Sequence, residues 1–235
     1  MTAPGVLFLH GSGAGPDVWA VQLPRFEGSR AVWLFDPDDG PLPDTPAAAA
    51  ERVLPAVERM DAPRVLVGHS LGGAVALQLA AAAPGVVDGL VLIATGARLP
   101  VPDDAPQRAV DDNEREARRL TGAAYADPTA PLAERARAAI EEGGTDAPAS
   151  AYRARRAHDM RERLGDITAP ALVVAGARDP LTPPWLSSEL AEGLPSAHLV
   201  VLAAGSHMVI TENGADVNLL LAGFLARLEL TLAGL

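Results

Sequence analysis

The sequence predicts an α/β fold with a mostly parallel sheet of about six strands and helices on both of its faces. Short runs rich in β-branched residues alternate with helical patterns along most of the chain, which is typical of strands joined by right-handed helical crossovers. The runs are nearly continuous in apolar residues, as expected for strands that are covered on both faces. The chain is 49% hydrophobic, which is ample for a packed core.

Each expected element follows from its own local pattern. Strands are expected at residues 5–10, 31–36, 64–68, 87–94, 171–175 and 198–202. Helices are expected at residues 46–60, 71–83, 184–193 and 213–230. The last helix carries an apolar stripe at helical spacing, formed by Leu219, Leu220, Phe224, Leu225 and Leu228.

Residues 97–165 interrupt this alternation. The segment has no strand-like run and is rich in Ala, Arg, Asp and Glu, with Pro-rich joints at 100–106 and 128–131. We therefore expect a helical insertion here, between two strands of a core formed by residues 1–96 and 166–235. Twelve of the 19 arginines and 13 of the 30 acidic residues lie in the insertion, so it carries a net charge of −1 and the core carries −10.

Composition excludes several classes of protein. The 235 residues contain no cysteine, which rules out a cysteine nucleophile, a disulfide framework and a thiolate metal site, and we expect no metal or other cofactor. The net charge of −11 argues against a nucleic-acid partner. The apolar stretch at 5–9 is too short for a signal peptide, and polar residues interrupt the apolar region 71–97. We therefore expect no membrane partner and a cytoplasmic location, while the sequence leaves the oligomeric state open.

Ser70 is a candidate nucleophile. It lies in the run Gly68-His69-Ser70-Leu71-Gly72, between a predicted strand and a predicted helix, which is the context of a nucleophile elbow. The serine must adopt a strained backbone conformation to project its hydroxyl, and side chains two positions away would collide with their surroundings. Glycines at 68 and 72 meet that requirement. The N-terminus of the following helix directs partial positive charge toward negative charge that develops near Ser70.

A serine nucleophile needs a general base and a carboxylate that orients the base. Of the five histidines, His207 follows the last predicted strand, where open α/β sheets place their sites. Asp179 follows the preceding predicted strand, so three candidate groups each come after the carboxyl end of a strand. As alternatives, Asp179 could cap the next helix, and Ser70 and His207 could be turn or loop residues without a catalytic role.

Four motifs together resemble those of the α/β-hydrolase superfamily, in its capped serine hydrolase and esterase form. They are His10-Gly11-Ser12-Gly13, Gly68-His69-Ser70-Leu71-Gly72-Gly73, Gly176-Ala177-Arg178-Asp179 and Gly205-Ser206-His207. The chain order of serine, aspartate and histidine is also that of the superfamily. The resemblance covers nearly the whole chain apart from the insertion, although the first predicted strand corresponds to the superfamily's third, so that the usual N-terminal hairpin is missing.

The resemblance implies a particular division of roles. Residues 97–165 would form a helical cap over the site, and the backbone N–H groups of Ser12 and Leu71 would form the oxyanion hole. We therefore expect a serine hydrolase that cleaves a small carboxylic ester through an acyl-enzyme. Alternatives on the same three residues are a thioesterase, a C–C bond hydrolase, or a lyase of the kind used in menaquinone synthesis. A non-enzymatic alternative is a receptor that binds a small molecule on a hydrolase fold.

Other residues are candidates for contact with the small-molecule substrate. His10, Gly11 and His69 lie within the motifs, and Trp19 is interpreted as packing beneath the loop, with substrate contact as the alternative. The insertion also carries arginines that alternate with acids at helical spacing, namely Arg115, Arg118, Arg119, Arg153, Arg155 and Arg156. This spacing favours solvated ion pairs, and the alternative is that one or two of these arginines face the site and bind an anionic substrate.

Overall fold

A computed structural model describes residues 4–26, 43–144 and 146–234 of the chain. The described residues form a parallel sheet of five strands in the order β1-β2-β3-β4-β5. The strands are β1 (Gly5–Leu9), β2 (Arg64–His69), β3 (Gly89–Ile93), β4 (Ala171–Gly176) and β5 (Ala197–Leu202). The parallel α/β sheet is therefore confirmed, and the strand predicted at 31–36 lies outside the described residues.

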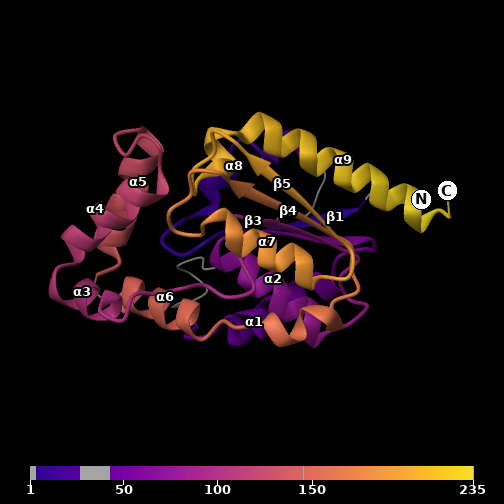
Figure 1. Cartoon of the computed structure of the whole chain (residues 1–235), viewed down its shortest axis with the longest axis horizontal. Helices are drawn as coiled ribbons and strands as arrows, with labels where there is room; N and C mark the ends of the chain where they lie inside the picture. Colours follow the sequence, from indigo (N-terminus) through magenta and orange to yellow (C-terminus); the bar gives the residue numbers. More distant parts are fainter. Residues whose placement is uncertain (1–3, 27–42, 145, 235) are drawn as a thin grey trace.

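Among the described residues, five α-helices belong to the part of the chain that builds the sheet. They are α1 (Pro46–Glu58), α2 (Leu71–Ala82), α7 (Pro184–Gly193), α8 (Val209–Glu212) and α9 (Gly214–Leu232). Figure 1 shows α1, α2 and α7 on one face of the sheet and α9 on the other. The single helix expected at 213–230 is thus preceded by a separate short helix, α8, with Asn213 at the junction.

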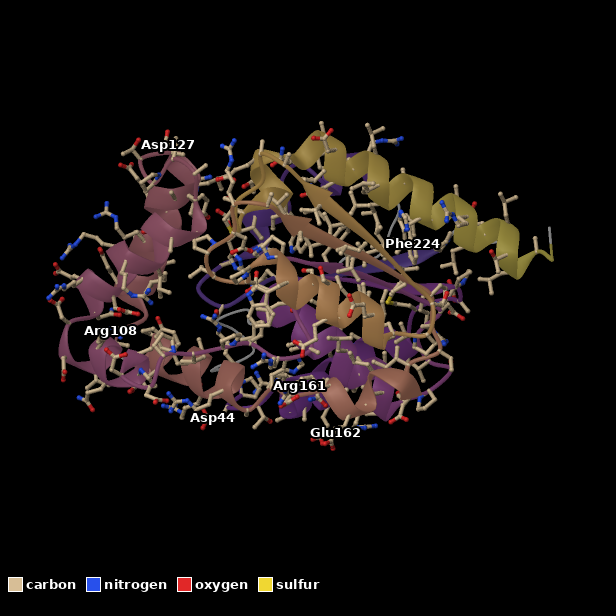
Figure 2. All side chains as sticks on the ribbon, in the orientation of Figure 1. Asp44, Arg108, Asp127, Arg161, Glu162 and Phe224 are labelled. Carbon is tan, nitrogen blue, oxygen red and sulfur yellow. The ribbon has the colours of Figure 1, made fainter. Side chains whose placement is uncertain are left out.

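Successive residues of each of the strands β1 to β4 point to opposite faces of the sheet, and both sets are buried. Leu7, Leu66 and Leu90 pack against α1 and α2 in one core cluster. Their neighbours along the strands, such as Phe8 and Val65, pack in a second cluster beneath α9. This arrangement explains why the apolar runs are continuous. Phe224, which lies between α9 and the sheet in Figure 2, belongs to the second cluster.

Strand β5, at one edge of the described sheet, departs from that pattern. Residues of β5 are half-buried or exposed, and the Val201 side chain is 44% exposed. Complete coverage of both faces is therefore a wrong prediction for β5, which lies at one edge of the described sheet and is less covered than β1 at the other edge. Likewise Leu219, at one end of the predicted apolar stripe of α9, is 72% exposed.

The predicted insertion contains helices and no strand among its described residues. Between β3 and β4 the chain forms α3 (Ala105–Asp111), α4 (Asn113–Ala124), α5 (Pro131–Glu142) and α6 (Asp146–Arg156), followed by the 3₁₀ turn Arg161–Asp166. We refer to residues 105–156 as the α3–α6 segment. Figure 1 shows that this segment stands to one side of the sheet. No helix in the described part of the chain is long and apolar enough to span a bilayer.

Candidate active site

Ser70 lies at the junction of β2 and α2, in a strained backbone conformation. Its φ of 53° and ψ of −120° fall in a region that L-residues rarely adopt. Two hydrogen bonds hold this conformation: the Ser70 N–H donates to the carbonyl of Ile93 at 2.9 Å, and the Thr95 hydroxyl donates to the Ser70 carbonyl at 2.8 Å. The neighbouring β3 and the residues that follow it therefore stabilise the turn that presents the serine hydroxyl.

The glycines on either side of Ser70 allow close backbone approach. A Cβ atom at Gly72 would lie 2.1 Å from the carbonyl oxygen of Leu9, and one at Gly68 would lie 2.6 Å from backbone atoms of Gly72 and Gly73. Neither position can accept a side chain without moving the backbone. The sharp strand-to-helix turn thus depends on both glycines, as the sequence motif indicates.

His207 follows β5 and connects Ser70 to Asp179. Its Nε2 atom lies 3.1 Å from Ser70 Oγ, and its Nδ1 atom lies 2.8 Å from Asp179 Oδ2. All three residues are buried. The structure therefore brings together the three predicted residues, from the carboxyl ends of β2, β4 and β5, in a continuous hydrogen-bonded chain. Such a chain can move the serine proton onto the imidazole.

Asp179 is held by the turn that follows β4. The backbone N–H groups of Leu181 and Thr182 each donate to Asp179 Oδ1 at 2.8 Å. The N-cap residue of α7 is Pro183, so Asp179 holds the turn and does not cap the helix. Burial by itself would raise the pKa of Asp179, but His207 and the hydrogen bonds from Thr182 outweigh burial and leave the pKa below its usual value. The carboxylate is therefore ionised and able to orient His207.

Thr182 is a site residue that the sequence reasoning missed. Its hydroxyl lies 2.6 Å from Asp179 Oδ2 and 3.1 Å from His207 Nδ1, and it also reaches the carbonyl of Ala94 at 2.9 Å. The hydroxyl thus lies where the imidazole and the carboxylate meet. The only signal in the sequence is its position three residues after Asp179, which is common in turns and points to no specific role.

His69 forms a hydrogen bond with the backbone of His207. Its Nε2 atom donates to the His207 carbonyl at 2.9 Å, and the two rings lie 4.9 Å apart. Burial, reinforced by the nearby His207, lowers the pKa of His69 to about 3, so its imidazole is neutral at pH 7. His69 lines the cavity described below, but its hydrogen bond is to His207.

The loop after β1 passes close to Ser70. A Cβ atom at Gly11 would lie 3.0 Å from the Ser70 Cβ atom, and Ser12 lines the cavity next to it. His10 is fully buried, and its Nδ1 atom donates to the Gly11 carbonyl at 2.9 Å. Leu71 is the first residue of α2, so its N–H has no acceptor within the helix.

Trp19 lies in the core and does not line the cavity. It is fully buried, and its ring packs against Phe8 of β1 with the centroids 5.0 Å apart. The structure thus places Trp19 beneath the loop that carries Gly11 and Ser12, which is the packing role that the sequence favoured.

A cavity of about 1120 Å³ opens above Ser70 and His207. One wall comes from the loops after the strands, and the opposite wall comes from helices α4, α5 and α6. Apolar side chains dominate the part formed by α4 and α5, with Leu120, Tyr125, Leu132 and Ile140 among them. Among the described residues, no group of three or more His, Asp or Glu side chains is placed to hold a metal ion.

The arginines of the α3–α6 segment fall into two groups. Some form ion pairs away from the cavity: Arg118 pairs with Glu114 at 3.5 Å on the surface, and Arg119 pairs with the buried Glu116 at 2.7 Å. Arg153 and Arg155, by contrast, line the cavity. Helical spacing alone did not distinguish these two environments.

Comparisons with known proteins agree on one family. The profile of the Alpha/beta hydrolase family matches residues 6–218. The protein named "Putative carbamate hydrolase RutD" from Variovorax paradoxus is 34% identical, covering 95% of this chain and 92% of its own. The pimeloyl-[acyl-carrier protein] methyl ester esterase of Neisseria meningitidis is 31% identical, with 86% and 85% covered. A solved structure of a thermophilic esterase superposes with a TM-score of 0.82 at 26% identity, covering 95% of this chain and 90% of that one.

Proposed function

Because the chain belongs to the alpha/beta hydrolase family, and is therefore an enzyme of the hydrolase class, we propose that it cleaves small carboxylic esters through an acyl-enzyme on Ser70. The observation that carries this proposal is the hydrogen-bonded chain from Ser70 through His207 to Asp179, which ends at the floor of a large cavity. Similarity to two esterases supports the choice of an ester as the bond that is cleaved.

In the first half of the reaction the Ser70 oxygen attacks the ester carbonyl carbon. The Ser70 proton passes to His207 Nε2 as the new C–O bond forms, and the imidazolium is stabilised by the ionised Asp179. The N–H groups of Ser12 and Leu71 receive the negative charge on the former carbonyl oxygen. His207 then gives its proton to the leaving alkoxide oxygen, which breaks the ester C–O bond and releases the alcohol.

In the second half of the reaction, water attacks the acyl-enzyme by the same steps. His207 takes a proton from the water as its oxygen bonds to the acyl carbon, and a second tetrahedral intermediate forms in the same oxyanion hole. The bond between the acyl carbon and Ser70 Oγ then breaks, and His207 returns the proton to the serine. The products are one alcohol and one carboxylic acid, and the enzyme is regenerated.

We assign the role of a cap to residues 97–165, over a core formed by residues 1–96 and 166–235. Helices α4, α5 and α6 supply the cavity wall opposite Ser70, so substrate bound there would be enclosed between the two parts. Such enclosure excludes water from the charged intermediate and strengthens the contacts that stabilise it.

The proposal is tested with Ser70→Ala. Turnover of 4-nitrophenyl butyrate should fall by on the order of 10⁴-fold or more, because the nucleophile is lost while the fold is retained. A fluorophosphonate should label the wild type once, at Ser70, as read by mass spectrometry, and should not label the variant. Ser188→Ala is the matched control, since the Ser188 hydroxyl only donates to the Pro184 carbonyl within α7. Unchanged turnover in a folded Ser70→Ala protein would falsify the proposed mechanism.

A second candidate reaction is the cleavage of a carbamate. The 34% identical relative carries that activity in its name, and the same serine attack applies to a carbamate carbonyl. A substrate panel with one acyl chain and an ester, thioester or carbamate linkage separates these reactions. The highest kcat/KM on the ester supports the main proposal, and the highest on the carbamate replaces it.

A further inference from the structure

The cavity above Ser70 differs in charge from the rest of the protein. Its described lining residues include three aspartates and four arginines, whereas the whole chain carries a net charge of −11. They are Asp17, Asp44, Asp146, Arg52, Arg135, Arg153 and Arg155. The ionised side chains around the cavity thus favour an anion over a cation, although the protein as a whole repels anions.

Two of these arginines are neutralised by carboxylates of the core. Arg135 of α5 lies 3.4 Å from Asp17, and Arg153 of α6 lies 2.9 Å from Asp44. Figure 2 shows Asp44 beside α6, at the lower edge of the molecule. Both pairs are largely exposed, so each of these two arginines has a carboxylate counter-charge and is accessible to solvent.

Arg155 is in a different position. No described carboxylate lies within ion-pair distance of its guanidinium, which instead donates from Nη2 to the Pro100 carbonyl at 3.3 Å and lies 5.9 Å from the centre of the Tyr152 ring. The Nε atom is inaccessible to solvent and has no hydrogen-bond partner among the described residues. Nη2 of the guanidinium is therefore held by the protein, while no other hydrogen bond of the Arg155 side chain is found among the described residues.

The surroundings of Arg155 do not favour its positive charge. Burial lowers the pKa of Arg155 and the positive charge of Arg119 acts in the same direction, whereas Tyr152 and the carboxylate of Asp179 oppose the shift and do not cancel it. A guanidinium nevertheless stays protonated at pH 7, so the charge remains and must be stabilised by something. A half-buried cation without a described carboxylate in ion-pair distance gains most from a partner that brings negative charge and two acceptor oxygens, which is what a carboxylate offers.

We propose that Arg155 binds a carboxylate carried by the substrate, so that the preferred substrates are esters with a free carboxylate elsewhere in the molecule. This inference rests on the proposed function, because it assumes that the cavity above Ser70 holds the ester. The apolar side chains of α4 and α5 then contact the carbon chain, and Arg155 determines which end of the molecule reaches Ser70.

A matched pair of substrates tests the preference. Mono-4-nitrophenyl glutarate and 4-nitrophenyl valerate have the same reactive ester and similar length, and only the first carries a carboxylate. In the wild type, kcat/KM should be higher for the glutarate ester. Arg155→Gln should lower kcat/KM for the glutarate ester by on the order of 100-fold, and should change the valerate ester by less than about threefold. Arg155→Lys should restore only part of the loss, because an ammonium cannot form two parallel hydrogen bonds.

Arg156→Gln is the matched control. Arg156 is the next residue of α6, is exposed, and contacts Asp103 and the Pro102 carbonyl away from the cavity. The kcat/KM of this variant should equal that of the wild type on both esters. Equal losses on both esters in Arg155→Gln, or no preference for the glutarate ester in an active wild type, would overturn the inference and leave the proposed function standing.

Binding without turnover separates the two proposals. Glutarate should bind to the Ser70→Ala protein in a calorimeter, and the Kd should weaken by on the order of 100-fold when Arg155→Gln is added. Valeramide, which has a similar length and no charge, should bind both proteins equally. If glutarate binding depends on Arg155 while no ester is cleaved, the anion site is supported and the ester reaction is rejected. If glutarate binding does not depend on Arg155, the anion site is rejected.

Discussion

Ser70 and His207 are each held in place by hydrogen bonds with neighbouring residues. The strained Ser70 backbone is held by Ile93 and Thr95, and the His207 carbonyl accepts a hydrogen bond from His69. The Thr182 hydroxyl donates a hydrogen bond to Asp179, which in turn contacts His207. Reactive geometry at this site therefore depends on a layer of hydrogen bonds around the three central residues, each of which can be removed separately.

Thr182→Val should lower kcat/KM on an activated ester by about tenfold, because the isosteric valine removes the hydroxyl donor and leaves Asp179 less well stabilised as an anion. The pKa of Asp179 should rise, since hydrogen bonds from Thr182 contribute to its lowered value. The value of kcat/KM between pH 7 and 8 measures the first effect, and its decline as the pH is lowered from 7 to 3 measures the second. Thr182→Ser keeps the hydroxyl and should stay within about threefold of wild type. If serine and valine cause the same loss, Thr182 contributes packing and does not position Asp179.

At the scale of elements, a buried ionic cluster joins three helices of the α3–α6 segment. Glu116 of α4 is 2% exposed and accepts hydrogen bonds from Arg119 at 2.7 Å and from the hydroxyl of Tyr152 on α6. Arg108 of α3 reaches the same carboxylate at 3.3 Å. Burial would raise the pKa of Glu116, but the hydrogen bonds from Arg119 and Tyr152 lower it below its usual value. Helices α4 and α6 of the cavity wall are thus linked to each other and to α3 through the carboxylate of Glu116.

Glu116→Gln should destabilise the protein by about 1–3 kcal/mol, because Arg108 and Arg119 lose their shared counter-charge at a partly buried position. Urea unfolding followed by circular dichroism measures the free energy, and limited proteolysis should show cleavage first within residues 105–156. Glu114→Gln is the control: it breaks only an exposed pair with Arg118 at 3.5 Å and should cost less than about 0.5 kcal/mol. Equal costs for the two variants would contradict the assigned role of Glu116.

At the scale of the whole molecule, a buried histidine lies where the chain leaves the α3–α6 segment and leads back toward β4. His158 is 2% exposed, and its Nε2 atom donates to the Gly96 carbonyl at 3.1 Å. The N–H of Met160 donates to the Ala97 carbonyl at 2.7 Å beside it. Residues 96–97, before the α3–α6 segment, and residues 158–160, after it, are therefore joined by hydrogen bonds around one neutral imidazole.

His158 should make folding sensitive to acid. Burial lowers its pKa to about 4 in the folded protein, below the usual 6.5. The unfolded chain therefore binds a proton first as pH falls, so stability that is fully present above pH 6.5 is lost between pH 6.5 and 4. The loss is about 1.4 kcal/mol per pH unit for one proton.

The variant His158→Gln retains a donor near Gly96 but cannot bind the proton, so its unfolding free energy should fall less steeply with acid than that of the wild type. Urea midpoints measured between pH 7 and 4.5 give the two slopes. His198→Gln, at an exposed position of β5, is the matched control and should keep the wild-type slope. Parallel slopes for wild type and His158→Gln would rule out this contribution.

Much of this molecule could be predicted from sequence because the relevant signals are local. The strands predicted at 64–68 and 171–175 are found at Arg64–His69 and Ala171–Gly176, since runs of apolar residues between turns determine both position and burial. The turn around Ser70 could also be predicted, because the glycines that it requires, Gly68 and Gly72, lie within two residues of the serine. The alternation of strands and helices then places the carboxyl ends of parallel strands at one edge, where Ser70, Asp179 and His207 meet.

Other features depend on contacts between residues far apart in the chain, and only the tertiary structure decided them. Thr182 and His69 gain their roles from the approach of β2, β4 and the loop after β5. The arginines of α6 share one pattern in the sequence, yet Arg153 is paired with Asp44, Arg155 lines the cavity without a described carboxylate, and Arg156 lies outside it. Successive helical residues differ in direction by about 100°. The direction that faces the cavity is therefore determined by how the helix packs on the core, which its own sequence does not encode.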